Sequence, residues 1–294
     1  MLGVIEALGG RLARTDCLKL LFLLSQQEGN PRHYDFFPFH YGPFSYVAMQ
    51  DKRRLTDLGH LKDAEDFVLT KATGHLDALQ PSDLVAVLRL RSNVGVARGR
   101  ELMKRVYLEY PSFCCRSRVV DEVLSEDEKS RVAAVWNTDS SPCLFTIGYE
   151  GRTIDSFLCC LVGHNMRSVV DVRCNAVSMK YGFSKNALGR YLAASGVHYV
   201  HSTQLGIPSA FRDDLGSPES YHRLFGRYRE EILPRASESL KGLEEEVASY
   251  GRVALMCFEA NPFLCHRHVV ANAVVTAVPG LALHHVSESG SVFA

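Results

Sequence analysis

The spacing of hydrophobic positions changes near the middle of the chain. Over residues 1–120 these positions recur mainly at three- and four-residue intervals, the period of helices that bury one face. Over residues 143–294 short apolar runs rich in Val, Leu and Phe alternate with helical stretches. The stretch 121–142 between them is first acidic and then rich in Ser, Asp and Pro. We therefore predict a smaller, mainly helical N-terminal domain, a linker and an α/β C-terminal domain.

The N-terminal pattern is typical of a small binding module. Asp16 precedes a leucine-rich run at 18–24 and can cap the helix that this run predicts. Two further helices are predicted at 82–90 and 99–107, and the aromatic run 34–45 supplies a short extended segment. This combination is compatible with a winged-helix arrangement that binds nucleic acid, and equally with a protein-interaction module.

The C-terminal pattern predicts βαβ units. Strands are expected at 144–148, 168–172, 198–201, 252–258 and 281–286, and helices at 154–164, 185–194, 221–232, 234–250 and 265–275. This alternation favours a Rossmann-like, mostly parallel sheet flanked by helices. Ligands of such sheets bind at the carboxyl ends of the strands, so we expect a site there.

Composition narrows the class of protein without fixing its activity. The chain has 294 residues, 46% of them hydrophobic and 22% charged, which is ordinary for a globular protein. No apolar run reaches the roughly 18–20 residues of a membrane span, so no membrane association is expected. Nine cysteines in a chain without an evident export signal favour a reduced, cytoplasmic protein.

The net charge is zero, but one segment is strongly basic. Residues 89–118 contain eight Arg or Lys against two Glu, a local balance of +6. The candidate nucleic-acid-binding residues in this segment are Arg89, Arg91, Arg98, Arg100, Lys104 and Arg105. Such a cluster suits contacts with phosphates, although a solvated basic helix face has the same composition.

Polar residues follow the first two predicted strands. Gly148 and Tyr149 lie in a glycine-bounded turn whose backbone N–H groups could bind a phosphate or sugar oxygen. Asp171 and Arg173 alternate with valines at the end of the second strand. They could hold a substrate, with Arg173 on a phosphate and Asp171 on a sugar or water, or they could form a structural ion pair.

The run Met256–His268 has the highest concentration of polar and reactive side chains in the chain. Glu259 follows a strand, and Cys265, His266 and Arg267 begin a helix. Four interpretations compete: a Cys265 nucleophile, a metal site with Cys257, Cys265, His266 and His268 as ligands, a site in which Glu259 or Asp171 is the acid–base group, and buried cysteines without a function. The spacing of Cys257 and Cys265 lacks the short paired intervals of familiar zinc sites, so no metal and no cofactor are predicted.

Two loops supply further candidates for a ligand pocket. Tyr181, Phe183 and Lys185 interleave aromatic and basic side chains, which can stack on a base and hold a phosphodiester backbone. A second polar and aromatic wall is formed by His201, Gln204, Phe211, Arg212 and Tyr221.

Five motifs carry a resemblance to a known family. They are Thr146-Ile147-Gly148-Tyr149, Val170-Asp171-Val172-Arg173, Phe183-Ser184-Lys185, Tyr199-Val200-His201 with Leu205-Gly206, and Cys257-Phe258-Glu259 with Cys265-His266-Arg267. The C-terminal half resembles the domain of unknown function 488 family, which implies an α/β sandwich with these acidic, basic and thiol side chains at one site. The N-terminal half is similar to helical modules that precede this domain, and Tyr41-Gly42-Pro43 is similar to part of some antitoxin and proteolytic-adaptor proteins.

Three functions fit these observations. The leading hypothesis is a DNA N-glycosylase-type hydrolase that excises a modified or damaged base, in DNA repair or phage defence. Asp171 or Glu259 would place the water, His266 or Tyr149 would donate a proton, and Arg173 and Arg267 would hold phosphates. The alternatives are a small-molecule nucleotide or sugar-phosphate hydrolase or transferase, and a ligand-sensing DNA-binding protein without catalysis.

Overall fold

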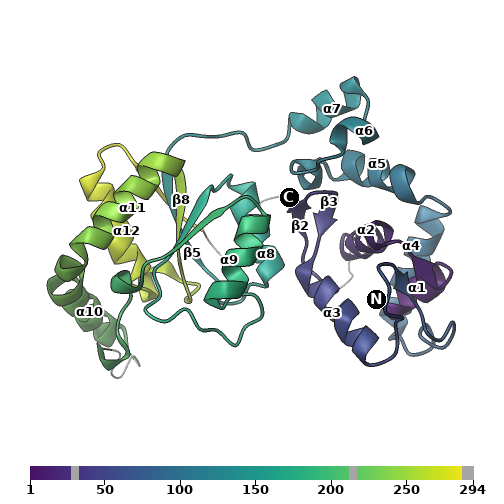
Figure 1. The fold of residues 1–294 in the computed structure, drawn as a ribbon, viewed down its shortest axis with the longest axis horizontal. Helices are drawn as coiled ribbons and strands as arrows, with labels where there is room; N and C mark the ends of the chain where they lie inside the picture. The colour runs from purple at the N-terminus through teal and green to yellow at the C-terminus, as the bar shows by residue number, and fades with distance from the viewer. Residues whose placement is uncertain (28–32, 212–216, 287–294) are drawn as a thin grey trace. The chain divides into compact units, whose positions relative to one another are not determined.

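The computed structural model describes residues 1–27, 33–211 and 217–286, and the chain divides into two compact units, Met1–Trp136 and Asn137–Ala294 (Figure 1). The division falls inside the predicted linker. The acidic part of that linker forms two helices of the first unit, α6 (Val120–Val123) and α7 (Glu126–Ala133). Ser125 starts α7 with a capping box, because its hydroxyl accepts from the Glu128 N–H while the Glu128 carboxylate accepts from the Ser125 N–H.

The N-terminal unit is mainly helical, as predicted. Its larger helices are α1 (Leu2–Ala7), α2 (Arg14–Ser25), α3 (Tyr46–Asp57), α4 (Pro81–Val94) and α5 (Gly99–Glu109). Two short antiparallel pairs accompany them, β1 (Arg11–Leu12) with β4 (Phe67–Val68) and β2 (Phe37–Phe39) with β3 (Gly42–Phe44). The winged-helix arrangement of this unit stays a prediction.

Helix α2 forms the centre of the N-terminal core. It is apolar on nearly all sides, and even Lys19 is buried on it. The Lys19 ammonium donates to the Tyr41 carbonyl oxygen at 2.7 Å, which compensates for part of its lost hydration. Burial lowers the pKa of Lys19 to about 8.

The C-terminal unit is built on a five-stranded parallel sheet. The strands are β5 (Cys143–Gly148), β6 (Ser168–Asp171), β7 (His198–His201), β8 (Arg252–Cys257) and β9 (Ala282–His285), in the order β7-β6-β8-β5-β9. Strands β5 and β8 are buried along their whole length, because helices cover both faces of the sheet. The predicted α/β fold with a parallel sheet is confirmed.

The flanking helices form two layers. Helices α8 (Ile154–Gly163) and α9 (Lys185–Ala194) lie on one face of the sheet, and α11 (Ser237–Tyr250) and α12 (Arg267–Ala277) lie on the other (Figure 1). The remaining helix, α10 (Pro218–Arg227), contributes Leu224 and Phe225 to the same core as α11 and α12. No helix among the described residues is long and apolar enough to cross a membrane.

The strand order places three chain segments at one edge. Strand β8 pairs with β6 on one side and with β5 on the other, so Asp171, Cys257 and Gly148 end neighbouring strands. The chain leaves β5 toward α8 on one face and leaves β8 toward α12 on the opposite face. A crevice at such a switch point is the usual ligand site of open α/β sheets.

The complete burial of β8 leads to a prediction about the free energy of unfolding. Val253 has no exposed surface, whereas Val177 is 72% exposed. We expect Val253→Ala to lower the free energy of unfolding by on the order of 2 kcal/mol, because it removes buried methyl groups and leaves a cavity. Val177→Ala is the matched control and should change it by less than about 0.5 kcal/mol. Urea unfolding of both variants measures the difference, and equal midpoints would contradict the assignment of β8 to the core.

Candidate functional site

A pocket of about 280 Å³ opens at the carboxyl edge of the parallel sheet. Its walls come from the segments that follow β5, β6 and β8 and from α10. The lining residues that matter below are Tyr149, Arg173, Tyr221, Phe225, Cys257, Glu259, Cys265 and His266. Six of these eight positions lie at or within two residues of a strand end or of the start of α12, which is where the sequence predicted a site.

Asp171 and Arg173 form a buried ion pair beneath the pocket. Arg173 Nη2 donates to Asp171 Oδ2 at 2.6 Å, and its Nε donates to Oδ1 at 2.8 Å. The Arg173 backbone N–H also donates to Oδ1, and the Tyr199 hydroxyl donates to Oδ2. Burial favours a lower pKa for Arg173, but the hydrogen bonds and charge of Asp171 raise it, so the guanidinium stays charged.

The structure corrects the predicted role of Asp171. Its side chain has no exposed surface, and four donors occupy its two oxygens, which is about the full capacity of a carboxylate. Asp171 also does not line the pocket. It is therefore a positioning residue that orients Arg173, and the structural ion pair considered for the two residues is the arrangement found.

Arg173 connects the ion pair to the aromatic wall. Its Nη1 donates to the Tyr149 hydroxyl oxygen at 3.1 Å, and its Nη2 donates to the Phe183 carbonyl oxygen. The Tyr149 ring stacks on Phe183 with 4.4 Å between centroids and meets Phe258 edge-on. The Tyr149 hydroxyl therefore keeps its own proton available, because its oxygen is the acceptor in the contact with Arg173.

Glu259 is held at the pocket rim by its backbone. Arg267 Nη1 donates to the Glu259 carbonyl oxygen at 2.6 Å, and Nη2 donates to the Ala260 carbonyl oxygen at 2.9 Å. A Cβ atom at Gly148 would overlap that Glu259 carbonyl, so glycine permits the close approach of the two segments. The glycine of the β5 turn thus serves packing at this edge.

The predicted substrate-binding role of Arg267 is also corrected. Its side chain is fully buried, it does not line the pocket, and its guanidinium is used to hold the 259–260 backbone. Arg267 is a positioning residue for Glu259.

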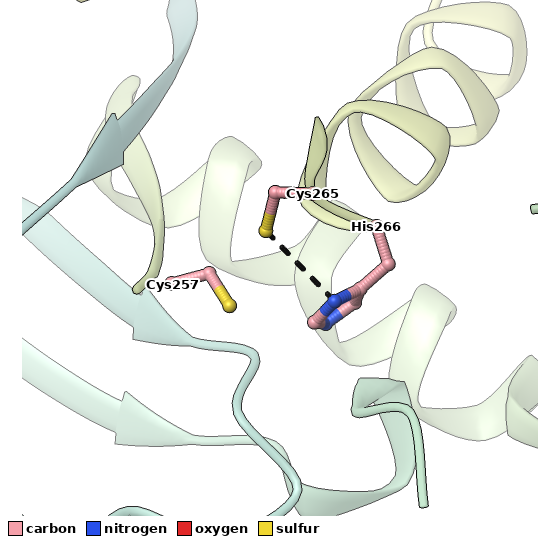
Figure 2. A group of neighbouring side chains, drawn as sticks. All are labelled: Cys257, Cys265 and His266. Atoms are coloured by element: carbon pink, nitrogen blue, oxygen red, sulfur yellow. Dashed lines mark hydrogen bonds between the residues drawn. The ribbon is translucent and has the colours of Figure 1, made fainter. Parts of the chain in front are cut away.

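Cys257, Cys265 and His266 converge at the floor of the pocket (Figure 2). Each is at most 5% exposed. His266 Nε2 donates to the Val172 carbonyl oxygen at 2.9 Å, and Nδ1 lies 3.9 Å from Cys265 Sγ. Both ring nitrogens are engaged within the protein, so the geometry does not favour the predicted role of His266 as a proton donor to the substrate.

The two thiols of this cluster differ in acidity. A hydrogen bond from the Cys257 S–H to Cys265, together with burial, raises the pKa of Cys257 well above its usual value. Burial opposes ionisation of Cys265 as well, but the hydrogen bond from Cys257 and the charges of His266 and Arg267 bring its pKa well below the usual value.

Several predicted residues lie outside the pocket lining. Phe183 is buried beneath Tyr149, Lys185 is exposed at the start of α9, and the Tyr181 hydroxyl accepts from the Tyr191 hydroxyl. His201 Nε2 donates to the Arg173 carbonyl oxygen at 2.8 Å and so supports Arg173 from behind. Arg212 lies outside the described residues.

Two apolar lining residues of the pocket were not among the residues predicted from the sequence. Phe225 and Phe258 line the pocket, and the exposed Phe258 ring lies against Tyr149. A signal for Phe225 exists in the sequence, because it follows Tyr221 by four residues on a predicted helix and must share its face. Phe258 ends an apolar run and gives no such signal.

Three of the six candidate nucleic-acid-binding residues form ion pairs or hydrogen bonds within the N-terminal unit. Lys104 pairs with Glu128 at 2.8 Å, and Arg105 pairs with Glu109 at 2.7 Å. Arg98 donates to the Ala97 carbonyl oxygen. The other three candidate side chains, which are exposed, are Arg89, Arg91 and Arg100.

The fold and pocket define the class of the C-terminal unit, an open α/β domain with a polar and thiol-bearing site at its switch point. Residues 153–274 match the family model described as domain of unknown function DUF488. The matched span begins after the Thr146–Tyr149 motif and excludes the N-terminal unit. Comparison with curated proteins gave no match, and comparison with solved structures gave none.

The buried ion pair of Asp171 and Arg173 leads to a second prediction about the free energy of unfolding. Asp171→Ala should lower the free energy of unfolding by about 3–5 kcal/mol, because it leaves the buried Arg173 charge without its partner. The exposed pair Arg227–Glu231 provides the control, and Glu231→Ala should cost less than about 1 kcal/mol. Chemical unfolding measures both, and a loss for Asp171→Ala no larger than that of the control would show that the pair is not structural.

Proposed function

We propose that the C-terminal domain is a hydrolase that cleaves the N-glycosidic bond of a modified or damaged nucleobase, in DNA repair or phage defence. The observation that supports this most is that Glu259 and the fixed Arg173 line one pocket together with the rings of Tyr149, Tyr221 and Phe225. The pocket volume of about 280 Å³ lies near the lower limit of small-ligand sites, roughly 300 Å³, and suits a base or nucleoside.

The chemistry assigns one role to each polar group. Glu259 takes a proton from water while the water oxygen bonds to the anomeric carbon of the sugar. The C–N bond breaks, and the base leaves with the bonding electron pair and accepts a proton from the Tyr149 hydroxyl. The proton on Glu259 then returns to Tyr149 through solvent, so that one water is consumed for each base released.

Arg173 supplies binding rather than proton transfer. Asp171 keeps its guanidinium charged and fixed, so it is ready to hold a phosphate oxygen next to the reacting sugar. The aromatic side chains can receive a base that has been rotated out of a duplex, which is how enzymes reach a base inside DNA.

The test uses duplex oligonucleotides that each carry one candidate modified base, alongside the corresponding free nucleosides. Wild-type protein should release free base and leave an abasic sugar, measured by chromatography and by strand cleavage at abasic sites. Glu259→Gln should reduce the rate by about 10²–10⁴-fold, because the amide cannot accept the proton. The exposed Glu245 on α11 provides the control, and Glu245→Gln should leave the rate unchanged. Equal rates for wild type and Glu259→Gln, or no release from any substrate, would contradict the proposal.

A second function, hydrolysis of a free nucleotide or sugar phosphate, is supported by a separate observation. The pairs Lys104–Glu128 and Arg105–Glu109 neutralise part of the basic segment that would otherwise favour DNA.

DNA binding separates the two functions. If the exposed arginines of α4 and α5 bind phosphates, the triple variant of Arg89, Arg91 and Arg100 to Ala should weaken duplex binding. It should also make the dependence of log affinity on log salt shallower by up to about 3, one for each lost contact. Gel shifts between low and moderate salt measure this slope. Wild-type protein that does not shift duplex DNA would favour the free nucleotide, and a triple variant with an unchanged slope would remove these arginines from the interface.

A further inference from the structure

Three atoms that could bind a metal lie close together in the C-terminal unit, although the spacing of their residues along the chain does not indicate a metal site. The Sγ atoms of Cys257 and Cys265 and a ring nitrogen of His266 lie within 4.8 Å of one another. The three side chains point toward a common centre from the end of β8 and the start of α12 (Figure 2). All three are buried and line the pocket. We propose that Cys257, Cys265 and His266 bind a zinc ion.

The orientation of His266 supports this assignment. Its Nε2–H donates to the Val172 carbonyl oxygen, which leaves the lone pair of Nδ1 directed toward the sulfurs. Histidine ligands of metals commonly donate their second ring N–H to a backbone carbonyl, because that bond fixes the tautomer and the ring plane. Val172 is itself fixed, since its N–H donates to the Met256 carbonyl oxygen between β6 and β8.

The distances are close to those that zinc requires. Zinc bonds of about 2.3 Å to sulfur and about 2.0–2.1 Å to nitrogen, at tetrahedral angles, separate the ligand atoms by roughly 3.5–3.8 Å. Cys265 Sγ and His266 Nδ1 are already 3.9 Å apart. All three ligand atoms lie within 4.8 Å of one another, so modest side-chain rotations would bring them to these separations.

The donor atoms select the kind of metal. Two thiolates and one imidazole are soft or borderline ligands, which favour zinc over the oxygen-binding ions magnesium and calcium.

The site has the pattern of a catalytic centre. Structural zinc sites use four protein ligands, whereas catalytic sites use three and leave the fourth position to water. Here the three ligands share a pocket with Glu259, which lies two residues after Cys257. A zinc-bound water loses its proton near neutral pH, so the metal would provide the attacking hydroxide. This last consequence rests on the proposed function, while metal binding itself does not.

The test measures metal in the full-length chain purified without chelators from zinc-containing medium. We expect about one zinc per chain by elemental mass spectrometry. Replacement by cobalt should give near-ultraviolet thiolate-to-cobalt absorption and the strong visible bands of a tetrahedral site. Cys257→Ser, Cys265→Ser and His266→Ala should each weaken zinc binding by at least about 100-fold, more than the usual effect of changing a residue behind a ligand.

Two matched variants serve as controls. Cys159→Ser removes a thiol on α8, and His268→Ala removes the histidine two residues after His266, and neither residue belongs to the cluster. Both should keep one zinc per chain. Circular dichroism verifies the fold of each variant, and the cobalt spectrum of the wild type tests the thiolate ligands even where a variant does not fold.

Three results would overturn the proposal. They are wild-type protein that retains no zinc after exposure to it, a cobalt form without thiolate absorption, and cluster variants that bind zinc as tightly as the controls. A disulfide between Cys257 and Cys265 in protein purified under reducing conditions would also exclude the site. None of these measurements depends on turnover, so failure of the proposed hydrolysis leaves the metal result interpretable.

Discussion

The pairing of β8 between β5 and β6 is the constraint on which the site depends. It brings the ends of three strands side by side, although the segments lie more than eighty residues apart at the extremes. Cys257 then lies opposite Gly148 in the register, and Val172 continues the β6 ladder against Met256. The register fixes which face Cys257 presents, because a strand shifted by one residue would turn its side chains to the other face.

Two buried arginines, Arg173 and Arg267, hold the segments around the pocket in place. Arg173 requires a compensating charge, and Asp171 supplies it so completely that its carboxylate has no capacity left for a substrate. Arg267 donates to the backbone carbonyl oxygens of residues 259 and 260. The ion pair with Asp171 thus fixes the Arg173 guanidinium at the pocket. The hydrogen bonds from Arg267 to the backbone fix the position of Glu259.

The sequence was sufficient for the strands, the fold class and the presence of a pocket at the carboxyl edge of the sheet. Apolar runs bounded by polar residues identify β5 and β8, because strands buried on both faces need apolar side chains at every position. Individual roles at the site could not be predicted. The sequence places Asp171 beside Arg173, but only the fold adds Tyr199 from β7 and buries the carboxylate.

The same limit explains why spacing along the chain does not reveal the cysteine cluster. Short paired intervals identify zinc sites whose ligands lie on one hairpin or one helix turn, where sequence distance fixes spatial distance. Cys257 ends a strand and Cys265 precedes a helix, and the turn that includes residues 258–264 closes the gap between them. The third side chain of the cluster, His266, is oriented from elsewhere, by the carbonyl of Val172 just after β6. In an open α/β sheet the relevant spacing is the 4.7–4.9 Å between adjacent strands, which no interval along the chain reveals.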